Sequence, residues 1–155
     1  MKVDLEKWKN NWFDNEEQFQ AFCILMISQE FPKLRGKVWH TPNEQYIPRQ
    51  EGESESDYKL RCARYGNMNK AKGKVAGVKD ILIKFNGILY PIELKQPKRG
   101  MNDAQKIVNE VWNKDCPQIP EVLFFTPYEV YMYCKWIVAT NLKINFPQDF
   151  KSYQS

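Results

Sequence analysis

Two apolar runs on either side of an Asn-Gly pair form the clearest pattern in the sequence. The runs cover residues 77–83 and 88–95, and Asn86 and Gly87 lie between them. Runs rich in β-branched residues that flank Asn-Gly predict a β-hairpin, because this pair readily adopts the positive φ angles of a tight hairpin turn. The pattern therefore predicts two antiparallel strands.

Three segments have the apolar spacing of amphipathic helices. Residues 14–30 begin with a capping Asp14 or Asn15, residues 103–114 follow a capping Asn102, and residues 127–141 begin with Pro127. Apolar side chains recur at intervals of three and four, so each helix is expected to bury one face. The expected inward-facing residues are Phe19, Phe22, Cys23, Met26 and Ile27 in the first helix, Ala104, Ile107, Val108, Val111 and Trp112 in the second, and Val130, Tyr131, Cys134, Ile137 and Val138 in the third.

Further strands and a basic segment complete the predicted elements. Residues 37–41 are short and β-prone, and residues 121–126 are predicted to form a buried strand. Residues 44–56 contain too much Pro, Gly, Ser and Glu for regular structure, so an exposed loop is expected there. Residues 57–74 combine basic with aromatic side chains, and a helix is predicted in their first half, ending near Gly66.

Composition narrows the class of protein. The 155 residues have the length of one domain, 1–155, with a core expected over about residues 15–141, and 43% hydrophobic content can fill it. No apolar run is long enough to span a membrane and the N-terminus does not resemble a signal peptide, so a cytoplasmic protein without a membrane partner is expected. The four cysteines form no C-x-x-C pair, which argues against a zinc site. A net charge of +4 permits a polyanionic partner without requiring one.

Charged residues gather at one end of the predicted hairpin. Asp80 opens its first strand, and Glu93 and Lys95 end its second strand two residues apart, so that both leave the same face. Burying such charges is costly unless they pair with each other or hold a cation. Taken alone, the pattern is more often a structural salt bridge. The alternative is a Mg²⁺ or Mn²⁺ site, for which Asp80, Glu93 and the peptide carbonyl of Leu94 could supply oxygen ligands.

A metal site of this kind suits the hydrolysis of a phosphodiester. A bound cation lowers the pKa of a water ligand and neutralises charge on the phosphate, while Lys95 could orient the attacking water. A phosphate backbone delivered to such a site needs basic neighbours, although a solvated surface is the usual meaning of a basic run. The basic residues expected to contact nucleic acid are Lys59, Arg61, Arg64, Lys70, Lys72 and Lys74, with Lys98 and Arg99 in the loop after the hairpin.

Other polar residues are candidates on separate grounds. Glu16 lies beside the apolar stripe of its helix, where it is either a partner of the helix dipole or a part of the site. Gln105 lies in the first turn of its helix, close to the expected position of Lys95. His40 ends a predicted strand and could contact the substrate, but a lone histidine there is more often a surface residue than a catalyst.

These motifs resemble the VRR-NUC family of the PD-(D/E)XK nuclease superfamily, and specifically its short stand-alone members in phages and prophages. The G-V-x-x-G-V-P-D-L core of the family is matched by residues 73–81, and its I-E-L-K strand by residues 92–95. The likeness covers about residues 15–126. The other matching positions are Glu16, Gln20, Phe31, Pro32, residues 39–44, Gly100, Asn102 and Gln105.

The resemblance implies a fold, an activity and a site. The fold would be a restriction-endonuclease-like α/β core with a mixed sheet of about four strands flanked by helices. The activity would be a Mg²⁺- or Mn²⁺-dependent DNA endonuclease for structured or branched DNA, similar to Holliday junction resolvases. It would act as a homodimer in a bacterial cell or a phage-infected host. By the family pattern, Asp80, Glu93, Leu94 and Glu16 would hold the metal, and Lys95 and Gln105 would complete the catalytic set.

The sequence departs from the family pattern at two positions. Lys79 stands where the family usually has proline, and since proline contributes no ligand, geometry rather than chemistry is expected to change. Asn102 replaces the usual serine, and both residues cap helices well. The rival interpretation is a catalytically silent module that binds nucleic acid or a host protein on a nuclease fold, and Lys79 is the feature of the motif that favours it.

Overall fold

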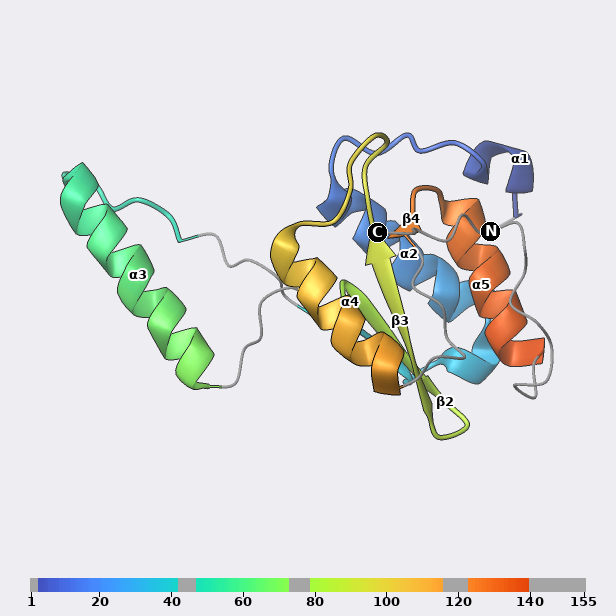
Figure 1. Cartoon of the computed structure of the whole chain (residues 1–155). Coiled ribbons are helices and arrows are strands. Elements are labelled where there is room, and N and C mark those ends of the chain that lie inside the picture. Colours follow the sequence, from blue (N-terminus) through green and yellow to red (C-terminus); the bar gives the residue numbers. More distant parts are fainter. Residues whose placement is uncertain (1–2, 42–46, 73–78, 116–122, 140–155) are drawn as a thin grey trace.

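The chain adopts an α/β architecture in which helices cover a mixed four-stranded sheet (Figure 1). The computed structural model describes residues 3–41, 47–72, 79–115 and 123–139. Residues 73–78 lie outside these ranges, and they include Lys74 of the predicted basic segment and the first two residues of the predicted hairpin. The first residues of the predicted strand 121–126 and the last of the predicted helix 127–141 also lie outside them. None of the described helices combines the length and apolar character needed to cross a bilayer.

The sheet has the strand order β1-β2-β3-β4. Strands β1 (Val38–His40), β2 (Ile81–Phe85) and β3 (Ile88–Leu94) are antiparallel neighbours, and β4 (Leu123–Phe124) is parallel to β3. The predicted hairpin is confirmed as β2 and β3. Its turn has φ angles of 48° at Asn86 and 78° at Gly87, the left-handed values that a two-residue hairpin turn requires.

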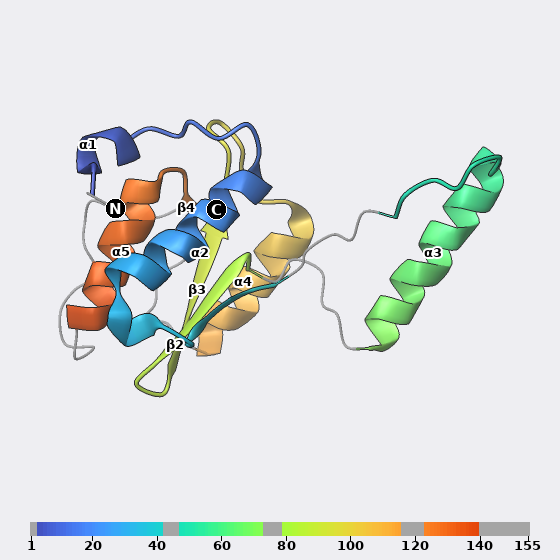
Figure 2. The ribbon, with the colours of Figure 1, turned by 180° about the vertical axis from the view of Figure 1, so that it is seen from behind.

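One face of the sheet carries the main hydrophobic core. Helices α2 (Glu16–Glu30) and α5 (Pro127–Ala139) pack against this face, together with the 3-10 helix Pro32–Leu34, and the short helix α1 (Leu5–Trp8) packs on α5 (Figure 2). Most of the predicted inward-facing residues of α2 and α5 are buried there, and Phe22, Tyr131 and Val138 are partly buried. Asn15 caps α2 by accepting a hydrogen bond from the Gln18 amide, as predicted.

Helix α4 (Asp103–Asp115) covers the opposite face, in an orientation that the sequence pattern predicts only in part. Val108 is buried as expected, and Ala104 and Trp112 are partly buried. Ile107 and Val111 were expected to face inward, but their side chains are 63% and 53% exposed. Gln105 and Asn109 are buried instead. Polar contacts explain this orientation of the helix. The Gln105 side-chain amide donates a hydrogen bond to the buried carboxylate of Glu93, and the Asn109 side-chain amide contacts the sulfur of Met101.

Helix α3 (Glu55–Ala71) differs from its predicted bounds at both ends. It begins within the expected loop because Ser54 caps it through the Asp57 amide, 3.1 Å away. It also continues through Gly66, since a helical glycine costs only about 1 kcal/mol relative to alanine. None of the described side chains of α3 is buried, and both ribbon views show the helix apart from the sheet.

Candidate active site

The charged end of the hairpin forms a buried polar cluster. Because Ile81 is opposite Ile92, the preceding residue Asp80 lies beside Glu93, on the face of the sheet that α4 covers. Both carboxylates are buried, and Glu93 is only 1% exposed. The structure therefore brings together the two acidic residues that the motif places at opposite ends of the hairpin.

Hydrogen bonds hold both carboxylates in place. The Leu94 amide donates to Asp80 Oδ2 at 2.7 Å. Glu93 Oε1 lies 3.0 Å from Lys95 Nζ and also accepts a hydrogen bond from Gln105 Nε2. The Gln105 side chain is fixed in turn, because its Oε1 accepts the Asn102 amide at 3.0 Å, the reciprocal half of a helix capping box. The helix cap thus aims the Gln105 amide at Glu93.

The peptide carbonyl of Leu94 is oriented toward the same cluster. In an extended strand, the N–H and C=O of one residue point to the same neighbouring strand. The Leu94 N–H reaches Asp80, whereas the next amide, that of Lys95, donates to the Phe124 carbonyl on β4 at 2.9 Å. The Leu94 carbonyl therefore faces the Asp80 side of β3, where the sequence placed it as a metal ligand.

Glu16 reaches the edge of the cluster from the first turn of α2. Its Oε1 lies 3.5 Å from the amide nitrogen of Gln96, the residue that follows Lys95. If Glu16 served only the dipole of its own helix, it would not need to approach the Gln96 amide just after β3. Glu16 therefore lies, partly buried, at the periphery of the cluster. From there its negative charge helps to raise the pKa of Asp80.

Two residues that the sequence did not assign to the site hold the backbone of Asp80. Gln20 Nε2 donates to the Asp80 carbonyl at 2.8 Å, and the Thr41 amide donates to the same oxygen at 3.0 Å. Gln20 lies four residues after Glu16, on the same face of the helix, so this spacing could have identified Gln20 as a neighbour of the site. Thr41 lies within the segment 39–44 that resembles the family pattern, but its contact with Asp80 depends on the pairing of β1 with β2.

Burial sets the electrostatics of the two carboxylates. It raises the pKa of Asp80, and it raises the pKa of Glu93 to about 7, with the charge of Asp80 as a further cause. The positive charges of Lys95 and Lys79 act in the opposite direction on both groups. Two buried carboxylates that resist simultaneous ionisation form a site in which added positive charge is favourable.

The residues present fit a hard divalent cation. Glu93 Oε2 is buried and has no hydrogen-bond partner, an arrangement that is costly unless a further group satisfies it. Mg²⁺ commonly binds through one or two carboxylates and keeps several waters, so Asp80, Glu93 and the Leu94 carbonyl suffice. No group of three His, Cys, Asp or Glu side chains within the described ranges could hold a metal by itself. Water and substrate oxygens would supply the remaining ligands.

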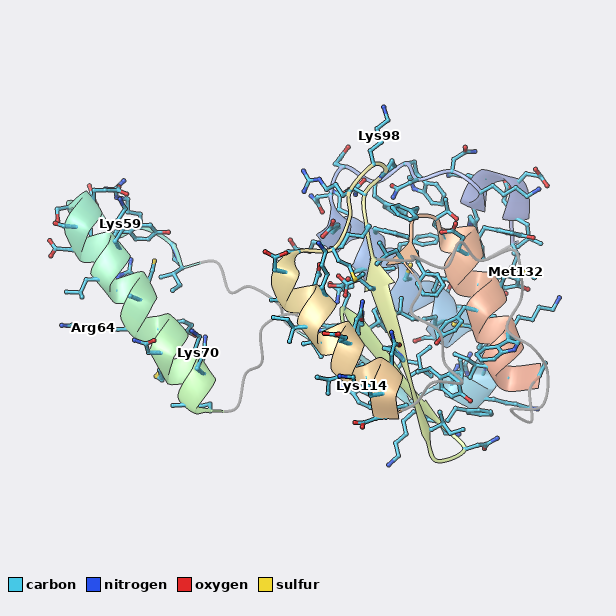
Figure 3. The ribbon with its side chains drawn as sticks, in the orientation of Figure 1. Lys59, Arg64, Lys70, Lys98, Lys114 and Met132 are labelled. Atoms are coloured by element: carbon cyan, nitrogen blue, oxygen red, sulfur yellow. The ribbon has the colours of Figure 1, made fainter. Side chains whose placement is uncertain are left out.

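The predicted nucleic-acid-binding residues fall into separate groups. Lys59 and Arg61 on α3 are already paired, at 3.6 Å from Glu55 and 2.7 Å from Glu53 respectively. Arg64, Lys70 and Lys72 form no ion pair with the acidic residues that the structure describes, and Figure 3 shows Arg64 and Lys70 on α3, away from the sheet. The structure does not bring this helix to the carboxylates.

The exposed residues at the end of the hairpin lie nearer to the cluster. Lys98 and Arg99 belong to the loop that begins after Lys95, and Figure 3 shows Lys98 projecting from it. His40 pairs with Ile81 in the sheet, one position from Asp80, and its side chain is exposed. All three side chains are exposed, and in the chain or in the sheet register they lie close to the residues of the cluster.

Comparison with known proteins assigns the chain to no group. No family model matches the sequence, and neither a curated protein nor a solved structure matches the chain. The geometry of the cluster and the motif residues are therefore the features of the chain that bear on its function.

Proposed function

We propose that this chain is a divalent-metal-dependent DNA endonuclease that hydrolyses phosphodiester bonds in structured or branched DNA. The observation that carries the proposal is the buried pair Asp80 and Glu93, in which Glu93 Oε2 lacks a hydrogen-bond partner. A buried carboxylate in a purely structural salt bridge would have both of its oxygens satisfied by hydrogen bonds. The order of the motif residues, similar to that of VRR-NUC nucleases, supports the same activity.

The division of work among the residues follows from their positions. A bound Mg²⁺ or Mn²⁺ would acidify a water ligand and offset negative charge on the phosphate. Asp80, Glu93 and the Leu94 carbonyl would hold the ion, while Gln105 and the Leu94 amide keep the carboxylates oriented. Lys95 Nζ, 3.0 Å from Glu93, would orient the attacking water and stabilise the charged phosphate in the transition state.

The direct test is cleavage of labelled DNA. A four-way junction, a flap and a linear duplex are incubated with the protein and Mg²⁺ or Mn²⁺, beside the variants Asp80→Ala and Lys95→Ala. We expect the wild type to cut a branched substrate faster than the duplex, and neither variant to cut any of them. Cleavage that persists in both variants would refute the site.

Binding of DNA is expected to depend on the basic residues of α3 that form no ion pair with an acidic residue of the described ranges. Replacing Arg64 and Lys70 together with alanine should lower affinity for every DNA structure tested by roughly tenfold, and should reduce the slope of log K against log salt by about 2, because two phosphate contacts are lost. The measurement is fluorescence anisotropy of labelled DNA across a salt series, with EDTA present so that no substrate is cut.

The matched control for this test is the Lys59→Ala variant. Lys59 is on the same helix but is 3.6 Å from Glu55, so its charge is partly neutralised before DNA arrives. Its loss should change affinity less than the loss of either Arg64 or Lys70 alone. Equal effects for all three substitutions would show that the ion pairs do not govern DNA binding.

We also propose that the protein acts as a homodimer, because cutting both strands of a junction calls for two sites related by twofold symmetry. Ile107 and Val111 form an exposed apolar pair on α4 that a second copy could cover. Light scattering at micromolar concentration should give twice the mass of the chain for the wild type and a lower mass for the variant Ile107→Glu with Val111→Glu. The variant Leu25→Glu, at an exposed apolar position on α2, is the control and should remain dimeric.

The rival function is a silent binding module, and the burial of Lys79 beside Asp80 is the observation that favours it. An ammonium near the carboxylates can take the place that a cation would need. Tight binding of a branched DNA by the wild type without cleavage in either Mg²⁺ or Mn²⁺ would support this rival.

A further inference from the structure

All buried charges within the described ranges gather at one end of the hairpin. They are Lys79, Asp80, Glu93 and Lys95, and Lys79 is only 4% exposed. The family pattern has proline at the position of Lys79, which suggested a change of geometry alone. A buried ammonium next to two candidate metal ligands instead changes the charge of the site.

The four buried side chains are two ammonium groups and two carboxylates, and the carboxylate of Glu16 lies partly buried at their edge. A buried ammonium is stable only near compensating negative charge. Asp80 and Glu93 are the buried carboxylates described at this end of the hairpin, and Lys95 already contacts Glu93 at 3.0 Å. The charge of Lys79 lowers the pKa of both carboxylates against the raising effect of burial, which is consistent with its position beside them.

We propose that Lys79 is an internal counter-cation of Asp80 and Glu93 and competes with the divalent metal for these carboxylates. The proposal rests on the metal site of the proposed function and adds a residue that controls the affinity of that site. The charge of Lys79 offsets part of the negative charge that would attract a dication to the cluster. Removing it makes the cluster more negative by one unit, which at the effective dielectric of a protein site strengthens the binding of a dication by roughly tenfold or more.

A merely structural role for the Lys79 side chain leads to the opposite expectation. The backbone of Lys79 is held by the Thr41 hydroxyl, which donates to the Lys79 carbonyl, and a change of side chain preserves this bond. If the side chain only packed the strand entry, its loss would loosen the ligands and weaken metal binding. Tighter binding is therefore a result that a structural role would not produce.

The test is calorimetric titration of Mn²⁺ alone into the full chain, without DNA. The Lys79→Met variant, which keeps the length of the side chain without its charge, should bind Mn²⁺ about tenfold more tightly than the wild type. Lys79→Arg, which keeps the charge, should bind like the wild type. The control Lys84→Met changes an exposed lysine of β2 and should leave the affinity unchanged. Adding Asp80→Asn to Lys79→Met should abolish the gain.

The outcomes separate this inference from the proposed function. Equal or weaker Mn²⁺ binding by Lys79→Met, with DNA cleavage intact in the wild type, would overturn the role of Lys79 and leave the nuclease. Absence of Mn²⁺ binding in every variant, including Lys79→Arg, would overturn both. If Lys79→Met does not fold by circular dichroism, the variant Lys79→Gln takes its place, with the same tenfold gain expected.

Discussion

Asp80→Asn is expected to slow DNA cleavage by about a thousandfold while the protein stays folded. The amide oxygen of asparagine can still accept the Leu94 amide that Asp80 Oδ2 accepts at 2.7 Å, so the end of the hairpin keeps its hydrogen bond. The substitution removes the negative charge that would hold the cation, and a contribution of several kcal/mol to the barrier corresponds to this factor in rate. The measurement is single-turnover cleavage of a labelled four-way junction in Mg²⁺.

The control for this loss is Asp103→Asn. Asp103 is another carboxylate near the start of α4, but its side chain is 99% exposed and its contact with Lys106 at 3.7 Å is a surface pair. Its activity should equal that of the wild type. An Asp80→Asn protein that keeps more than a tenth of the wild-type rate would contradict the assignment of Asp80 as a ligand.

The free energy of unfolding of the metal-free protein is expected to fall as the pH rises from about 4.5 to about 7. The pKa of Glu93 is raised by burial from 4.5 to about 7 in the folded chain. Between these values the folded state therefore binds more protons than the unfolded state, and stability decreases with increasing pH. The loss is up to about 3 kcal/mol, since each unit of pKa corresponds to 1.36 kcal/mol. The raised pKa of Asp80 contributes in the same direction.

Urea unfolding in EDTA at pH 5 and pH 8 measures this effect. Glu93→Gln should flatten the difference between the two pH values, because the amide does not titrate, whereas Glu110→Gln on the exposed face of α4 should keep it. Mn²⁺ should restore more stability at pH 8 than at pH 5, since it binds the ionised carboxylates. A wild-type protein that becomes more stable between pH 5 and pH 8 in EDTA would contradict the burial of Glu93 as the dominant cause.

Much of the local structure follows from the sequence. Asn86-Gly87 and the alternation on either side of it predicted the hairpin, and the register of a hairpin then places Asp80 beside Glu93. The capping residues Asn15 and Asn102 predicted the starts of α2 and α4. The hairpin turn and the helix caps depend on residues that are close in the chain, so they can be predicted from the sequence before any tertiary contact is known.

Helix α4 shows where local periodicity was insufficient. Its apolar spacing pointed Ile107 and Val111 inward, yet the bond from Gln105 to Glu93 turns the helix so that they are exposed. A buried carboxylate without partners costs more than the exposure of two aliphatic side chains. The partner of Gln105 is on a strand that the helix meets only after folding, and the spacing within the helix does not contain that information.

The sequence by itself determined the hairpin, its turn and the acidic pair at its end. The tertiary structure alone decided that Glu16 contacts the Gln96 amide, that Lys59 and Arg61 form ion pairs, and that Lys79 is buried. The physical reason is that burial and ion pairing depend on segments distant in the chain, whereas turns, caps and strand alternation depend on adjacent residues.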